Sequence, residues 1–182
     1  MRSILGALLA VAVSFAANAQ NQPAQNQTAP QAAEEPQVEV TTNQDWHVAC
    51  RDTEVDGKAE RLCQMQQTLE EVDSGEPFLR ITIHYPRDNG DRPVMRIFAP
   101  LGVLLRPGIV MQIDDGEELR LPFQVCLGQP AACIVEGAME QDIVQLMKAG
   151  ISGEFRLSMV GNRQVEAPFS LKGFTKSINS LK

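Results

Sequence analysis

The chain has few of the features that mark several large classes of protein. It contains 16 lysine and arginine residues against 23 acidic residues, a formal net charge of −7. This balance argues against a protein that binds nucleic acid through general positive charge. Beyond its N-terminal region, no segment approaches the roughly 18 consecutive apolar residues that a membrane-spanning helix requires. Hydrophobic residues make up 43% and charged residues 21%, which is an ordinary globular balance and excludes collagen, coiled-coil rods and fully disordered chains.

Motifs for catalysis and cofactor binding are also missing. The sequence has no H-E-x-x-H pair, Walker loop, Rossmann glycine pattern or G-x-S-x-G elbow. Of the two histidines, His84 falls on the polar face of a predicted strand, and His47 follows Trp46, a predicted core residue. The acidic cluster Asp114–Glu118 lacks the EF-hand spacing and predicts a solvated hairpin tip rather than a calcium site. We therefore expect that the protein is not an enzyme and binds no cofactor or metal. A hydrolase that uses His84 or this cluster is the enzymatic alternative.

Cysteine is scarce, and the four that occur are Cys50, Cys63, Cys126 and Cys133. Their even number predicts two disulfides, for which three pairings are possible. The preferred pairing is Cys50–Cys63 with Cys126–Cys133, because each pair is close in sequence and encloses a turn-rich stretch. A zinc site or a redox-active pair is disfavoured, since the sequence has no C-x-x-C.

The N-terminal region predicts an export signal followed by a linker. A basic start, a short apolar run and an A-x-A triplet that ends at Ala19 predict a secretory signal peptide over residues 1–19. Residues 20–43 are rich in Gln, Asn, Pro and Ala and show no apolar periodicity, which predicts a disordered linker. A strand that starts at Val38 and Val40 is the alternative at the end of this linker. We expect no transmembrane segment in the mature chain.

The remaining residues, 44–182, predict a single mainly β domain, an antiparallel sandwich or barrel with one amphipathic helix. Alternating apolar and polar residues predict its strands. These strands cover residues 78–85, 94–98, 109–113, 119–123, 133–135, 154–160 and 164–171, with residues 125–126 continuing the strand at 119–123.

Two further predictions concern the end of the domain. An apolar stripe of Met139, Ile143, Leu146 and Met147 predicts a helix over residues 138–149 that packs on the core. The basic C-terminal segment is predicted to dock on the domain through apolar side chains, and contact with a membrane surface is the alternative. Those side chains are Leu171, Phe174, Ile178 and Leu181.

Several blocks of the sequence follow a pattern found in a known family. They are W-x-V-x-C at residues 46–50, C-x-M at 63–65, PLGVLLRPGIVMQIDDGEELRLPFQVC at 100–126, AAC at 131–133, MKAG at 147–150 and SLKGF at 170–174. The chain resembles the invasion-associated locus B family of secreted bacterial proteins over about residues 45–182. The resemblance implies an exported protein, periplasmic or associated with the outer membrane, in a family with some members linked to the entry of pathogens into host cells. It supplies no catalytic residues.

These observations predict an exported, non-enzymatic cell-envelope protein. We expect it to bind a protein, glycan or lipid component of the envelope or of a host surface, and not nucleic acid. A periplasmic carrier of a small ligand or lipid is the alternative, suggested by the apolar runs at residues 101–105 and 109–113.

Overall fold

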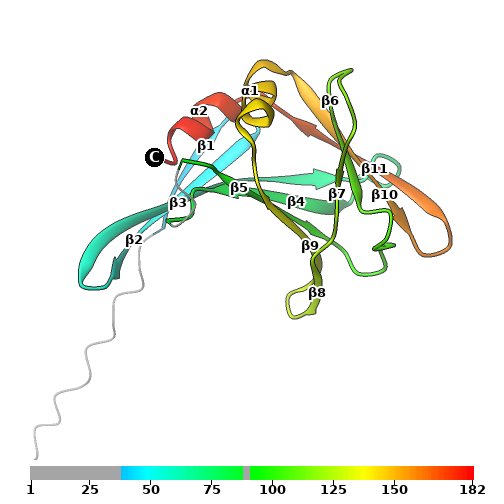
Figure 1. Ribbon diagram of the computed structural model, residues 1–182, viewed down its shortest axis with the longest axis horizontal. Helices are drawn as coiled ribbons and strands as arrows, with labels where there is room; N and C mark the ends of the chain where they lie inside the picture. The colour runs from blue at the N-terminus through cyan, green and yellow to red at the C-terminus, as the bar shows by residue number, and fades with distance from the viewer. Residues whose placement is uncertain (1–37, 88–90) are drawn as a thin grey trace, which may run out of the picture. The chain divides into compact units, whose positions relative to one another are not determined.

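The computed structural model of the protein describes residues 38–87 and 91–182. This part of the chain forms eleven strands and two short helices (Figure 1). One helix lies between β9 and β10, and the other follows β11. The strands are β1 Val38–Asn43, β2 Trp46–Val55, β3 Lys58–Glu70, β4 Pro77–His84, β5 Val94–Ala99, β6 Ile109–Ile113, β7 Leu119–Leu121, β8 Val125–Gly128, β9 Ala131–Ala138, β10 Ser152–Met159 and β11 Arg163–Ser170. The helices are α1 Gln141–Ala149 and α2 Phe174–Asn179.

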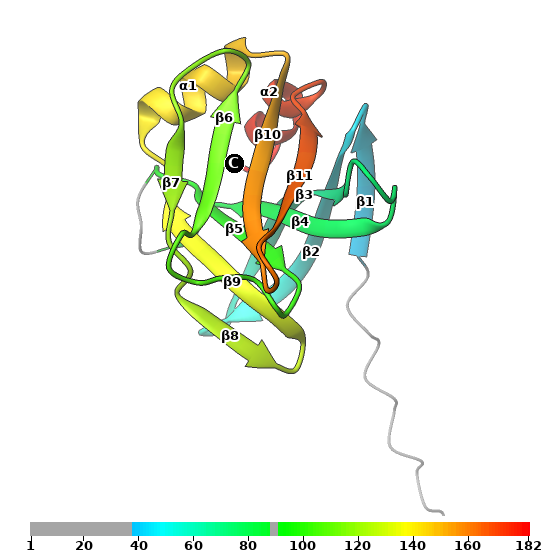
Figure 2. The same ribbon diagram turned by 90° about the vertical axis from the view of Figure 1, so that its right-hand side faces the viewer.

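The strands form two antiparallel sheets (Figure 2). The larger sheet has seven strands in the order β1-β2-β3-β4-β5-β9-β8, and the smaller has four in the order β11-β10-β6-β7. One continuous cluster of buried apolar side chains draws on both sheets and both helices. The predicted mainly β class with antiparallel sheets is therefore confirmed.

The predicted continuation of one strand was wrong. Residues 125–126 do not continue the strand at 119–123, because the chain changes sheets between them. β7 ends at Leu121 and pairs with β6 in the smaller sheet, whereas β8 pairs with β9 in the larger sheet. Pro122, which has no backbone N–H to donate to a ladder, stands at this crossing.

Two element boundaries also differ from the prediction. Residues 38–43 belong to a strand rather than to the predicted linker, since β1 pairs with β2 along its whole length. The predicted signal peptide at 1–19 and the predicted linker at 20–37 lie outside the described residues. The helix begins at Gln141, not at residue 138, and buries Val144 and Met147.

The predicted helix stripe is only partly correct. Met139 is buried but precedes the helix, Ile143 is half-buried, and Leu146 is exposed. The four C-terminal docking residues are all buried, as predicted. No helix within residues 38–87 and 91–182 is long and apolar enough to cross a membrane.

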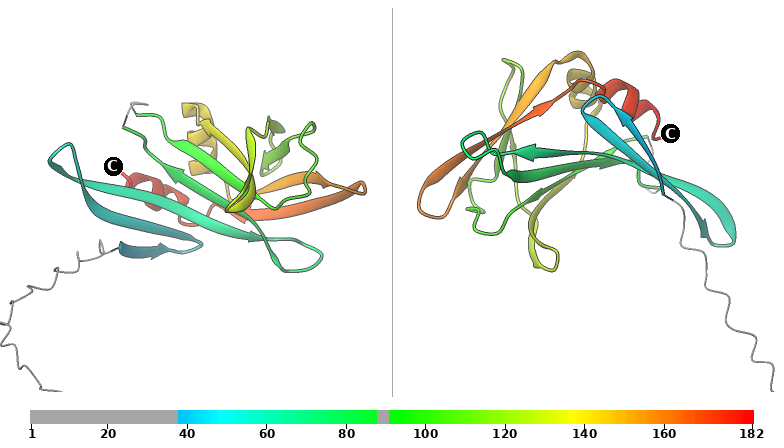
Figure 3. Two further views of the ribbon diagram at one scale, coloured as in Figure 1. Left: turned by 90° about the horizontal axis from the view of Figure 1, so that it is seen from below. Right: turned by 180° about the vertical axis from the view of Figure 1, so that it is seen from behind.

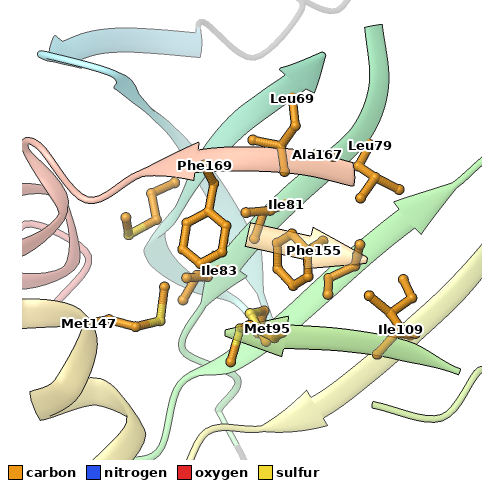
Figure 4. Close-up of a cluster of buried hydrophobic side chains, with 14 of the residues drawn as sticks. Leu69, Leu79, Ile81, Ile83, Met95, Ile109, Met147, Phe155, Ala167 and Phe169 are labelled. Carbon is orange, nitrogen blue, oxygen red and sulfur yellow. The ribbon is translucent and has the colours of Figure 1, made fainter. Parts of the chain in front are cut away.

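The core between the sheets is centred on two phenylalanines. Phe155 of β10 and Phe169 of β11 stack with their ring centroids 4.8 Å apart. They face Ile81 and Ile83 of β4, as Figure 4 shows, and all four side chains are buried. The strict alternation of β4 and β10 therefore places one face of each strand in this core.

A buried polar network joins β3 to the end of β11. The Gln67 side-chain amide donates to the carbonyl oxygens of Asp45 and Ser170, and its oxygen accepts from the Ser170 N–H. The Trp46 indole N–H donates to the same Ser170 carbonyl at 2.9 Å. Because these groups are satisfied by one another, Gln67 can be buried without leaving an unpaired amide.

The first strand and the last helix meet directly. The Asn43 side-chain amide donates to the Ser177 hydroxyl across 134 positions of sequence. Phe174, the first residue of α2, packs edge-on against Trp46 with ring centroids 5.4 Å apart. Gly173 precedes it with a φ of +85°, and a Cβ atom added there would lie 2.0 Å from the Asn43 carbonyl oxygen. This is why SLKGF requires glycine at its fourth position.

Both disulfides form with the predicted pairing. Cys50 of β2 is bonded to Cys63 of β3, and Cys126 of β8 to Cys133 of β9. In each pair the two residues are directly opposite in the strand register. Each bond therefore staples one hairpin of the larger sheet. Two structural disulfides indicate an oxidising compartment outside the cytoplasm.

Removing either disulfide is expected to destabilise the domain. The double substitution of Cys50 and Cys63 by alanine should lower the free energy of unfolding by about 3 kcal/mol, and that of Cys126 and Cys133 by about 2.5 kcal/mol, because the first bond closes the longer loop. Thermal unfolding of the two variants measures both values. Free thiols that react in the folded wild-type protein would contradict the prediction.

Candidate binding face

The larger sheet has one face that the rest of the domain does not cover. The smaller sheet and α2 pack against its other face (Figures 1 and 3). We call the uncovered side the outer face and define it by four cross-strand rows taken from the strand register. The rows are Val38, Arg51 and Leu62; Val40, Ala49, Gln64, His84, Val94 and Ala138; Thr42, His47, Gln66, Thr82, Arg96 and Glu136; and Thr68, Arg80, Phe98, Ile134 and Val125.

The third row is polar over its whole width. It crosses six strands, and five interstrand spacings of about 4.8 Å give it a length of about 24 Å. At one end the Thr42 hydroxyl and the His47 Nδ1 atom lie 3.0 Å apart, and at the other Arg96 is paired with Glu136. Apart from the buried Thr82, the hydroxyl, amide and charged groups of this row can form hydrogen bonds with a polar partner.

An arginine on an aromatic ring marks one end of the outer face. The Arg80 guanidinium carbon lies 4.4 Å from the centroid of the Phe98 ring. Both residues line an open hollow of about 360 Å³, together with Phe78 of β4, Pro130 of the β8–β9 turn and Ala131 and Ala132 at the start of β9. The second disulfide holds the hairpin that carries this turn. Stacking on the ring orients the guanidinium and leaves its N–H groups available to an incoming acceptor.

His84 lies on this face, half-buried beside charged neighbours. Burial lowers the pKa of its imidazole, and the positive charge of Arg96 lowers this pKa further, while Glu136 acts in the opposite direction. The folded protein therefore favours the neutral imidazole. The predicted position beside Arg80 and Thr82 is confirmed, although Thr82 itself is buried.

The lowered pKa of His84 makes stability depend on pH. Because the unfolded chain takes up a proton at higher pH than the folded protein, folding stability falls as the pH drops below about 6.5. His84→Gln should reduce the difference in urea midpoint between pH 7.5 and pH 5.5. His47→Gln, a substitution of the exposed histidine, is the matched control. An equal change in both variants, or none in His84→Gln, would contradict this assignment.

The other candidates from the sequence lie elsewhere. Asp114, at the tip of the β6–β7 hairpin, accepts hydrogen bonds from the backbone N–H groups of Ile151 and Ser152. Glu118 is paired with Arg156. His84 and the acidic cluster thus sit on different sheets. Within the described residues, no group of three or more His, Cys, Asp or Glu side chains is arranged to hold a metal ion.

The contact of Arg80 with Phe98 was not predicted from the sequence. Arg80 and Phe98 were each assigned to a strand, but their contact depends on the pairing of β4 with β5, in which they are directly opposite. The alternation in the two strands, with the Asn-Gly dipeptide in the sequence between them, is the signal that could have found this contact.

Comparison with known proteins shows where this fold occurs. A crystal structure of invasion associated protein b from Bartonella henselae matches with a TM-score of 0.62 and 21% sequence identity, over 79% of this chain and 94% of that chain. At this identity the match shows the fold alone. No curated protein matches the sequence. Residues 46–182 match the family described as Invasion associated locus B (IalB) protein, so the chain belongs to the invasion associated locus B family.

Proposed function

We propose that the protein is exported by its signal peptide and acts, without catalysis, by binding a component of its own envelope or of a host-cell surface. The disulfides support a location outside the cytoplasm. The family, together with the description of the Bartonella relative as invasion associated, supports a role at the cell surface or in the periplasm.

The observation that carries this proposal is the open outer face. Arg51 and Arg80 on this face form no ion pair with any residue in the described ranges. Val38 and Val40 expose 56% and 62% of their surface at its β1 edge. A surface that combines unpaired arginines, polar rows and exposed apolar edges is suited to a partner.

The carrier alternative gains no support from the apolar runs that suggested it. Ile109, Met111 and Ile113 are buried in the packed core between the sheets, and Leu101 and Leu105 are exposed at the surface. None of them lines the hollow at Arg80.

Blocking the outer face with a bulky side chain tests the proposal. The purified full chain is immobilised, incubated with solubilised envelope fractions, and the retained components are identified by mass spectrometry. Gln64→Trp places a bulky ring on the exposed outer face, and Glu166→Trp places the same ring on an exposed position of the smaller sheet. We expect Gln64→Trp to abolish retention of a reproducible component that Glu166→Trp keeps. Equal retention in both variants, or no reproducible component, would overturn the proposal.

A further inference from the structure

The outer face has a charge opposite to that of the whole chain. Its four rows contain Arg51, Arg80 and Arg96 but only one carboxylate, Glu136. With neutral histidines this is a net charge of +2, in a protein whose net charge is −7. Since Glu136 is engaged by Arg96, the two other arginines are the groups on this face that attract an anion.

The surroundings of Arg80 show what kind of anionic group fits. The guanidinium is held on Phe98, so its planar set of N–H donors can bind a carboxylate, sulfate or phosphate through two parallel hydrogen bonds. Phe78 and Pro130 give the adjoining hollow apolar walls. Such walls suit the C–H face of a sugar ring next to the charged substituent.

The rest of the face indicates an extended ligand rather than a single ion. The polar row next to the hollow at Arg80 crosses six strands and runs about 24 Å, from Glu136 on β9 to Thr42 at the β1 edge. A chain of sugars offers hydroxyl groups along its length, and these match a row that both donates and accepts hydrogen bonds.

The two stapled hairpins argue against a flat lipid surface as the partner. The β2–β3 and β8–β9 hairpins extend away from the side that carries α2 and the smaller sheet, on either side of the outer face (Figures 1 and 3). A flat bilayer would meet the tips of both hairpins before it reached the sheet between them. A rod-like chain can lie between the hairpins.

We propose that the outer face binds an anionic glycan, with Arg80 on Phe98 holding a carboxylate, sulfate or phosphate substituent and the accessible polar side chains of the row from Thr42 to Glu136 binding the sugar hydroxyls. This inference rests on the binding role proposed above and names the class of its partner.

Binding of the full chain to heparin oligosaccharides and to polygalacturonate tests the inference, with neutral dextran as the uncharged comparison. We expect both anionic glycans to bind, dextran not to bind, and affinity to fall with added salt. Arg80→Gln should weaken binding at least tenfold. Arg106→Gln makes the same change of charge at an exposed loop position and should leave binding within twofold. Thermal unfolding verifies that both variants are folded.

Three results would overturn the inference. They are failure of both anionic glycans to bind, equal weakening by Arg106→Gln and Arg80→Gln, and binding to vesicles of phosphatidylcholine and phosphatidylglycerol in place of the glycans. The Gln64→Trp experiment distinguishes a failure of the glycan inference from a failure of the proposed binding function. An envelope component lost in Gln64→Trp but retained by Arg80→Gln would keep the binding role and remove the anionic glycan.

Discussion

Gly173→Ala is expected to lower the free energy of unfolding by at least about 3 kcal/mol, a loss in the upper range for single substitutions. Two effects combine at this position. A left-handed conformation costs a residue with a side chain roughly 1–2 kcal/mol, and Gly173 has a φ of +85°. The added methyl group would also overlap the Asn43 backbone, 2.0 Å away. To relieve that overlap, α2 has to move away from β1, which disturbs the contact of Phe174 with Trp46.

A second glycine separates these two effects. Gly57, in the turn between β2 and β3, has a similar φ of +74° but no atom within 4 Å of an added Cβ. Gly57→Ala should therefore show only the conformational cost of about 1–2 kcal/mol. Urea unfolding followed by the fluorescence of Trp46, the only tryptophan, measures both variants. If the two losses were equal, the close approach of β1 to Gly173 would be refuted.

Phe155→Ala is expected to lower the free energy of unfolding by about 3–5 kcal/mol, the range for removal of a buried aromatic ring. The side chain is fully buried and stacks on Phe169. The Phe169 ring has little freedom to fill the space, because it already occupies the position beside Gly153, where an added Cβ would lie 2.1 Å from its Cζ atom. A cavity is therefore expected to persist between the sheets.

The neighbouring position on the same strand supplies the control for this prediction. Arg156 points to the opposite face of β10 and forms partly exposed ion pairs with Glu118 and Glu154. Arg156→Ala should lower stability by less than about 1 kcal/mol. Urea unfolding of both variants gives the two values. A loss below about 2 kcal/mol in Phe155→Ala would mean that the sheets close over the space.

The disulfides and most of the strands could be predicted because their signals are local. Cys126 and Cys133 flank a short turn, and the alternation in β4 distinguishes its buried face from its outer face without reference to any other strand. The turn residues between β10 and β11 likewise set the pairing of those neighbours. In each case the determining contacts span only a few residues of sequence.

The predictions that were wrong concern segments whose structure is determined by contacts with residues far away in the sequence. Residues 38–43 have a polar composition, yet they form β1 because β2 offers them a free edge and α2 binds Asn43. The break between β7 and β8 depends on which sheet each strand joins. Leu146 continues an apolar stripe but faces outward, since only the side of α1 that carries Val144 and Met147 meets the core. Periodicity alone does not contain this information.

The candidate face was predictable in its parts but not in its assembly. The polar side of β4, with Arg80, Thr82 and His84, follows from alternation. The contact with β5 and the placement of β9 beside it bring Phe98 and the Pro130 turn to the same hollow, and these depend on pairings between strands far apart in sequence.

The hydrogen bond between Asn43 and Ser177 has a consequence for the order of assembly. It connects the first described strand to α2, and the hydrogen bonds of Gln67 likewise cannot form without Ser170. During synthesis, or during passage through a narrow channel with the N-terminus leading, the earlier strands lack these contacts until Ser170 and Ser177 have emerged. Folding of the domain is thus expected to be completed only when residues 170–179 are available, and a chain truncated before Ser170 should remain susceptible to proteases.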